Sequence, residues 1–170
     1  EASAKLISGH FPNAHVFMIQ NGLGCEEMAS NYGDWPIISG VTFMSGTRHS
    51  DEHVEYELDT ATWMGPWAGT NARFEDVQQL EALINQSGLI AEAYEDLLPH
   101  QWSKLIFNSA VNSISAVTDL AHVKAFAVEE KIEDLGHLVF AMMNEAKEIA
   151  KARGVILADD PWVMNVNAVN

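Results

Sequence analysis

The chain has 170 residues, of which 48% are apolar and 19% are charged, and its formal net charge at pH 7 is −15. This composition is typical of a globular protein with one sizeable core or two small domains. Such an acidic surface repels phosphate backbones, so we predict that nucleic acid is not a partner. No apolar run approaches the length of a membrane span, so we also predict no membrane insertion.

The cysteine content and the two ends of the chain indicate its cellular compartment and whether it is part of a longer protein. Cys25 is the single cysteine, which rules out an internal disulfide. Residues 1–10 lack the basic stretch and apolar core of a signal peptide, and together these features favour a reducing cytoplasm. Residues 1–7 resemble the interior of a helix, and residues 161–170 end without a closing element. We therefore expect an internal segment of a longer protein.

The first half of the chain alternates short apolar runs with helical patterns. Periodicity and turn residues predict, in chain order, a helix, a strand, a short helix, two paired strands, a helix and a strand, at residues 2–7, 15–20, 25–33, 36–48, 53–63, 74–87 and 89–94. The helix at 74–87 places Val77, Leu80, Leu83 and Ile84 on one face.

After residue 95 the pattern is helical throughout. Long helices are predicted at residues 97–117 and 129–153. The core stripe expected on the second of them consists of Leu135, Leu138, Val139, Met142, Met143, Ala146, Ile149 and Ala150. The predicted fold class is therefore α/β followed by an all-α domain, with a boundary near residues 94–97.

A polar ladder runs through the first of these long helices. Lys104, Asn108 and Asn112 are spaced four residues apart. Four residues advance a helix by about 6 Å and turn it by about 400°, so the three side chains drift only about 40° per step. A solvated helix face is one interpretation, although Asn is a poor helix former. The other is a binding face for a small oxygen-rich molecule, because carboxamides donate and accept hydrogen bonds while an ammonium polarises a carbonyl.

The segment QNGLG, residues 20–24, is a second candidate site. It follows a predicted strand and precedes a helix, which is the usual place for a ligand in an open α/β sheet. Gly22 and Gly24 permit close approach of a backbone to a ligand, and the following helix offers free amides. The simpler interpretation, which the pattern by itself favours, is a turn.

Two other groups of reactive side chains have simpler explanations. His49 and His53 share a face of a strand, but no third ligand is spaced to complete a metal site. We therefore predict an exposed hairpin turn and no metal. Cys25 lies near a helix start, yet no base is evident beside it in the sequence, so we interpret it as incidental.

Four segments, in this order, resemble the ketopantoate reductase (2-dehydropantoate 2-reductase) family: QNGLGCEE, GVTFMSGTR, SGLIAEAYEDLLPHQWSKLIFNSAVNSISAVTDL and MNEAKEIAKARGV. The similarity extends over nearly all of the chain. It implies that residues 1–95 are the C-terminal part of a Rossmann-type NADP-binding domain. Residues 96–170 would then be the N-terminal part of a helical substrate and dimerisation domain.

The resemblance also implies a reaction and a set of roles. The reaction is NADPH-dependent reduction of a 2-keto acid, in the first place 2-dehydropantoate to pantoate in pantothenate and coenzyme A biosynthesis. Lys104 corresponds to the catalytic general acid, and Asn108 and Asn112 to asparagines that contact the substrate. Asn21, with Gly22 and Gly24, corresponds to the cofactor-binding segment for NADP(H). The implied partners are a small 2-keto acid and a second copy in a homodimer.

The chain also departs from the family pattern. It contains no strand followed by G-x-G-x-x-G, the loop that cradles the cofactor pyrophosphate. Ser113 stands where the family usually has proline, and residues 119–128 replace its Pro-Asn-Gly turn. Two alternatives therefore stay open: a related reductase that acts on a different 2-keto acid, and a non-catalytic binding module that retains the fold.

Overall fold

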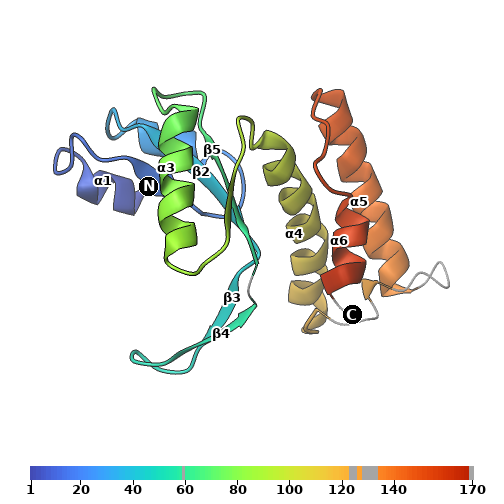
Figure 1. The fold of residues 1–170 in the computed structure, drawn as a ribbon. Coiled ribbons are helices and arrows are strands. Elements are labelled where there is room, and N and C mark those ends of the chain that lie inside the picture. Colours follow the sequence, from blue (N-terminus) through green and yellow to red (C-terminus); the bar gives the residue numbers. More distant parts are fainter. Residues whose placement is uncertain (59, 123–125, 128–133, 169–170) are drawn as a thin grey trace. The chain divides into compact units, whose positions relative to one another are not determined.

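The computed structural model describes residues 1–58, 60–122, 126–127 and 134–168. The chain divides into two compact units, Glu1–Leu97 and Leu98–Asn170 (Figure 1). Strands occur in the first unit, and the second is built from helices. The predicted fold class, an α/β region followed by an all-α region, is confirmed.

The first unit is built on a mixed four-stranded sheet. Its elements are α1 (Ala2–Ile7), β1 (Val16–Met18), α2 (Cys25–Ser30), β2 (Ile37–Thr42), β3 (Ser45–Arg48), β4 (Val54–Leu58), β5 (Thr62–Pro66), α3 (Phe74–Gln86) and β6 (Ala91–Ala93). The strand order is β1-β2-β5-β6. β1 is parallel to β2, β2 is antiparallel to β5, and β5 is parallel to β6.

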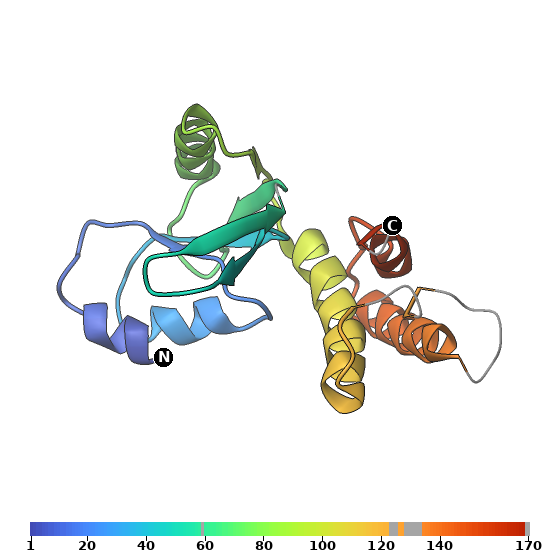
Figure 2. The same cartoon turned by 90° about the horizontal axis from the view of Figure 1, so that it is seen from below.

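Helices cover both faces of this sheet (Figure 2). α3 packs on one face, where Ile38, Met64, Val77 and Ala91 form a buried core. α2 lies against the opposite face, beside β2. Because successive side chains of a strand point to opposite faces, Ile38 faces α3 and its neighbour Ser39 faces α2.

The segment between β2 and β5 differs from the two long strands predicted for it. β2 leaves the main sheet at Thr42 and β5 re-enters it at Thr62, directly opposite. Between them, β3 and β4 pair as a separate hairpin with a register shift at Ser45 and Gly46. All four residues of β3 are exposed, as are Val54 and Tyr56 of β4, so these residues do not pack on the core.

In the described part of the second unit, three helices lie side by side (Figure 1). They are α4 (Leu98–Thr118), α5 (Leu135–Ala152) and α6 (Pro161–Ala168). The helix predicted at residues 97–117 is confirmed as α4. α5 confirms the later part of the helix predicted at 129–153, whereas residues 129–133 lie outside the described residues.

The core of the second unit is narrower than the predicted stripe. Val139, Met143 and Ala150 of α5 are fully buried. Leu138 and Ile149 are 46% and 52% exposed, so their assignment to the core is wrong for this chain. A 3.6-residue period identifies one wide apolar face, but the neighbouring α4 and α6 cover only its centre.

The sequence did not predict α6, which side-chain hydrogen bonds hold in place. Asn165 is fully buried, its Nδ2 donates to the Phe126 carbonyl at 2.9 Å, and its Oδ1 lies 2.8 Å from His122 Nε2. Lys147 forms an ion pair at 2.7 Å with Asp160, which precedes the helix. Such contacts span long sequence separations, so periodicity gives no sign of them.

Asp76 fixes the start of α3. Its carboxylate accepts a hydrogen bond from the Arg73 backbone N–H at 3.0 Å and pairs with the Arg73 guanidinium at 2.9 Å. The hydrogen bonds from Arg73 lower the pKa of Asp76 to about 2, from an ordinary value of 3.8. A carboxyl whose pKa is lower in the folded state stabilises the fold fully at pH values above its ordinary pKa. This stabilisation is lost as the pH falls through the lowered pKa.

We therefore expect Asp76→Asn to be less stable than the wild type at neutral pH, with a gap that closes as the pH falls from 3.8 to about 2. The measurement is urea unfolding of both proteins across this range. Glu75→Gln, on the same turn and exposed, is the matched control and should show no such pH dependence. A gap that stays constant with pH would contradict the assigned role of Asp76.

Gly40 in β2 is required by close packing. A Cβ atom at this position would lie 2.5 Å from the ring of Phe17. Overpacking of this kind costs about 1–3 kcal/mol, so Gly40→Ala should lower the free energy of unfolding by that amount. The cost should shrink in a Phe17→Ala background, where the ring is absent. Equal costs in the two backgrounds, measured by urea unfolding, would show that Phe17 is not the constraint.

Candidate functional site

The predicted polar ladder lies along one stripe of α4. Lys104 and Asn108 are half-buried, whereas Asn112 is exposed. Phe107 and Val111, which lie within about 60° of Lys104 around the helix, are buried in the second unit. The ladder therefore begins at the boundary of the core and ends in solvent. On a uniformly solvated helix face, all three side chains would be exposed.

The ammonium group of Lys104 is electrostatically unusual. Burial lowers the pKa of Lys104 below its ordinary value of 10.5, because removal from water disfavours the charged form. A lysine with a lowered pKa gives up its proton more readily than a surface lysine. Perturbed lysines of this kind are characteristic of sites that transfer protons or bind carbonyl groups.

The backbone beside Lys104 is held by its neighbour Ser103. The Ser103 side chain is 1% exposed, and its Oγ lies 3.0 Å from the carbonyls of Pro99 and Asp159 and accepts the Asp159 N–H at 3.2 Å. Asp159 belongs to the turn before α6. This link fixes α4 against that turn at the level of Lys104, and so restricts rotation of the helix that carries the ladder.

The second predicted set, Asn21, Gly22 and Gly24, lies on the loop between β1 and α2. Gly22 and Gly24 have φ angles of 97° and 89°, which L-residues with a side chain rarely adopt. A Cβ atom at either position would meet nothing within 4 Å, and residues 19–24 are exposed throughout. The segment is thus a true turn whose backbone is also open to a ligand.

Two acids occupy the start of α2, where the sequence pattern predicted free amides. α2 has six residues, and Glu26 and Glu27 lie in its first turn. Two carboxylates there offset the positive end of the helix dipole and repel phosphate. A neutral part of a ligand is therefore better suited to this loop than a charged one.

The structure groups the predicted residues into two sets, each described within its own unit. Lys104, Asn108 and Asn112 share α4 of the second unit. Asn21, Gly22 and Gly24 share a loop of the first. Within each set the members are brought together as the sequence pattern predicted.

The histidines of the β3–β4 hairpin are accounted for by contacts with each other and with a carboxylate. The rings of His49 and His53 stack with centroids 4.8 Å apart, and His49 Nε2 lies 2.8 Å from a Glu55 carboxylate oxygen. Among the described residues, no three His, Cys, Asp or Glu side chains are placed to hold a metal ion. Within the same residues, no helix has both the length and the apolar character needed to cross a membrane.

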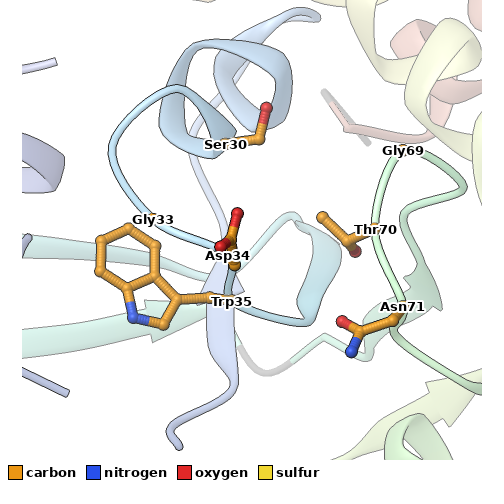
Figure 3. A pocket seen from close by; sticks show the side chains of 7 residues that line it. All are labelled: Ser30, Gly33, Asp34, Trp35, Gly69, Thr70 and Asn71. Atoms are coloured by element: carbon orange, nitrogen blue, oxygen red, sulfur yellow. The ribbon is translucent and has the colours of Figure 1, made fainter. Parts of the chain in front are cut away.

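A polar cavity of about 370 Å³ lies at the other end of the sheet, where β2 begins and β5 ends (Figure 3). It is lined by Ser30, Gly33, Asp34, Trp35, Gly69, Thr70 and Asn71. Thr70 Oγ1 accepts the Ile37 N–H at 3.0 Å, and Trp35 Nε1 donates to the Phe11 carbonyl at 2.9 Å. These groups hold the loops together, and none of the predicted site residues reaches this cavity.

Two family models match the chain in succession. The model described as "Ketopantoate reductase PanE/ApbA" matches residues 1–69, and "Ketopantoate reductase PanE/ApbA C terminal" matches residues 96–170. This chain belongs to the ketopantoate reductase family. The predicted family membership is thereby confirmed, and the two matches follow one another in the order that the quoted motifs indicated.

Curated relatives carry the name 2-dehydropantoate 2-reductase. The protein from Pyrococcus horikoshii is 29% identical over 140 residues, which cover 82% of this chain and 44% of that protein. The protein from Archaeoglobus fulgidus is 26% identical over 146 residues, which cover 80% of this chain and 49% of that protein. The chain thus spans about half the length of the curated relatives it matches.

Solved structures share the fold. The 2-dehydropantoate 2-reductase from Methylococcus capsulatus is 26% identical with a TM-score of 0.73, and the match covers 92% of this chain and 49% of that one. A D-mandelate dehydrogenase solved with NADH has a TM-score of 0.80 at 15% identity, over 99% of this chain and 54% of that one. At that identity the second likeness concerns the fold only.

We expect direct titration of Lys104 to give a midpoint below 10.5, because burial disfavours its charged form. The measurement is the ¹³Cε chemical shift of Lys104 as a function of pH, with the resonance assigned by its loss in Lys104→Arg. The reference is lysine acetylated on its α-nitrogen, with its ε-amine free, in the same buffer. A midpoint at or above that of the reference would contradict the desolvation of this ammonium.

Proposed function

We propose that this chain is part of an NADPH-dependent reductase that converts 2-dehydropantoate to pantoate. The observation that carries the proposal is Lys104, an ammonium with a lowered pKa on the same stripe as Asn108 and Asn112, in a chain of the ketopantoate reductase family. The names of the curated relatives support the choice of substrate. The two compact units would be parts of a nucleotide-binding domain and of a helical substrate domain, in that order.

Lys104 acts in this proposal as the general acid. When bound, a reduced nicotinamide would supply the hydride that the carbonyl carbon of the 2-keto acid accepts. Lys104 donates a hydrogen bond to the carbonyl oxygen and transfers its proton as negative charge develops there. The C=O bond becomes CH–OH, and Lys104 is left neutral until it regains a proton from solvent. Because burial has already lowered its pKa, the proton transfer is easier than from an ordinary lysine.

Asn108 and Asn112 orient the substrate. A carboxamide both donates and accepts hydrogen bonds, so it matches the hydroxyl and carboxylate groups of a small keto acid. Asn108 is half-buried beside Lys104 in the ladder and is assigned to the end of the substrate that reacts. Asn112 is exposed and is assigned to the outer polar groups.

The loop that contains Asn21, Gly22 and Gly24 is assigned to the nicotinamide end of the cofactor. The open glycine backbone fits a flat ring that approaches closely, and the Asn21 carboxamide matches the carboxamide of nicotinamide. The two acids that begin α2 suit this neutral end of the cofactor better than its phosphates. NADPH is the proposed donor, as the family resemblance implies.

Dimer formation and a cytoplasmic location complete the proposal. Leu138 and Ile149 of α5 are apolar and half-exposed, as expected for a helix that a second copy covers. A solved ketopantoate reductase from Staphylococcus aureus is described as dimeric, and at 17% identity this likeness concerns the fold.

The test uses the full gene product that contains this chain and follows NADPH oxidation with 2-dehydropantoate. We expect Lys104→Ala to lower kcat/KM by about 10²–10⁴, the usual worth of positioned proton transfer. In the wild type, kcat/KM should fall on the alkaline side as Lys104 loses its proton, with a midpoint below 10.5.

Ser109→Ala is the matched control for this experiment. Ser109 is exposed on the same helix, next to Asn108. Its hydroxyl donates a hydrogen bond to the Leu105 carbonyl, within the helix. Its kinetics should match the wild type. A loss of less than about tenfold in Lys104→Ala would rule out the assigned acid.

A substrate panel with the same enzyme separates the remaining alternatives. Faster turnover of another 2-keto acid would identify a related reductase and leave the role of Lys104 intact. Binding of NADPH without oxidation on any 2-keto acid would instead identify a non-catalytic module.

A further inference from the structure

Glu26 is a buried carboxylate in the first turn of α2. It is 6% exposed, although its neighbour Glu27 on the same turn is exposed. Burying a charged group is costly unless hydrogen bonds compensate it. Ser39 of β2, itself 2% exposed, donates its hydroxyl to Glu26 Oε1 at 2.7 Å. Helix-dipole complementarity explains an acid at this position but does not explain why one of the two acids is buried.

Ser39 is also the residue that faces the end of β1. In the parallel pairing of β1 with β2, Met18 lies opposite Ser39. The backbone of Ser39 is therefore registered with the residue at which the exposed loop 19–24 begins. Its side chain binds Glu26, two residues after that loop ends. Ser39 is thus next to both ends of the loop: its backbone is paired with the residue before the loop, and its side chain binds Glu26 after it.

The loop between these anchors is open to solvent along its length. Residues 19–24 are exposed, and Gly22 and Gly24 adopt φ angles that leave open space where a Cβ would be. An exposed segment with two glycines has high conformational entropy unless its ends are fixed. Its two ends are held by β1 on one side and by Glu26 on the other.

We propose that the Glu26–Ser39 hydrogen bond is a positioning clamp that holds Asn21 and the glycine backbone in the arrangement that receives the nicotinamide end of the cofactor. The inference rests on the proposed function for the cofactor. Neither Glu26 nor Ser39 is assigned contact with cofactor or substrate; both act through the loop. The QNGLGCEE pattern contains Glu26, but its burial involves Ser39 of β2, a distant partner that periodicity does not reveal.

The first test measures the loop itself in this 170-residue chain. Hydrogen–deuterium exchange of the amides of residues 19–25 should increase at least about tenfold in Glu26→Ala and in Ser39→Ala, because the anchored end is released. Glu26→Gln retains an oxygen that accepts from Ser39, so it should exchange like the wild type. Glu27→Ala is the matched control for the loss of a charge on the same turn.

Val77→Ala controls for general destabilisation. Val77 of α3 is fully buried, on the sheet face opposite to Glu26, and its truncation should leave exchange in the loop unchanged. If Glu26→Ala fails to fold, Ser39→Ala supplies the same readout with a smaller change. Unchanged loop exchange in Ser39→Ala would overturn the clamp.

The second test links the clamp to the cofactor in the full gene product. The dissociation constant of NADPH, measured by fluorescence titration, should rise about tenfold in Ser39→Ala and Glu26→Ala and return to the wild-type value in Glu26→Gln. A tenfold change corresponds to about 1.4 kcal/mol. Unchanged affinity in Ser39→Ala despite faster loop exchange would overturn the proposed link. A wild type that binds no NADPH would refute the proposed function, while loop exchange would still decide whether the clamp exists.

Discussion

The apolar stripe that forms the core of the second unit and the polar ladder lie on the same helix, α4, at fixed angles to each other. Phe107, Val111 and Ile114 form a buried apolar stripe along α4. Lys104 lies at the edge of this stripe, because three and seven residues along a helix bring Phe107 and Val111 back to nearly the same side. Rotation of α4 that moved one stripe would move the other, so packing of the core determines how far the ammonium is withdrawn from water. The lowered pKa of Lys104 is thus a consequence of where the apolar stripe lies.

The electrostatics of the two candidate sites are complementary. The ladder on α4 carries one cation of lowered pKa among carboxamides, which suits a carbonyl oxygen that gains negative charge during reduction. The glycine loop of the first unit is followed by Glu26 and Glu27, which suits a neutral ring. In a chain with a net charge of −15, such local differences would favour different parts of an anionic ligand at the two candidate sites.

Local patterns predicted those features that depend on neighbours along the chain. The helices, the strand before QNGLG and the ladder at Lys104, Asn108 and Asn112 all follow from periodicity and turn residues. The features that were missed depend on distant partners. The hairpin begins beyond Thr42, where β2 ends opposite the start of β5 at Thr62, and α6 is held by contacts of Asn165 and Asp160. The burial of Glu26 likewise requires Ser39, thirteen residues away.

Chemical rescue of Lys104→Ala in the full gene product examines the proposed acid most directly. Small primary amines added to this variant should restore turnover of the 2-keto acid in a saturable manner, because they fill the vacated space and supply the missing proton. Lys104→Met fills the same space without an ammonium and should not respond. Failure of every amine to raise the rate in Lys104→Ala, or equal stimulation of Lys104→Met, would contradict the role of Lys104 as the proton donor.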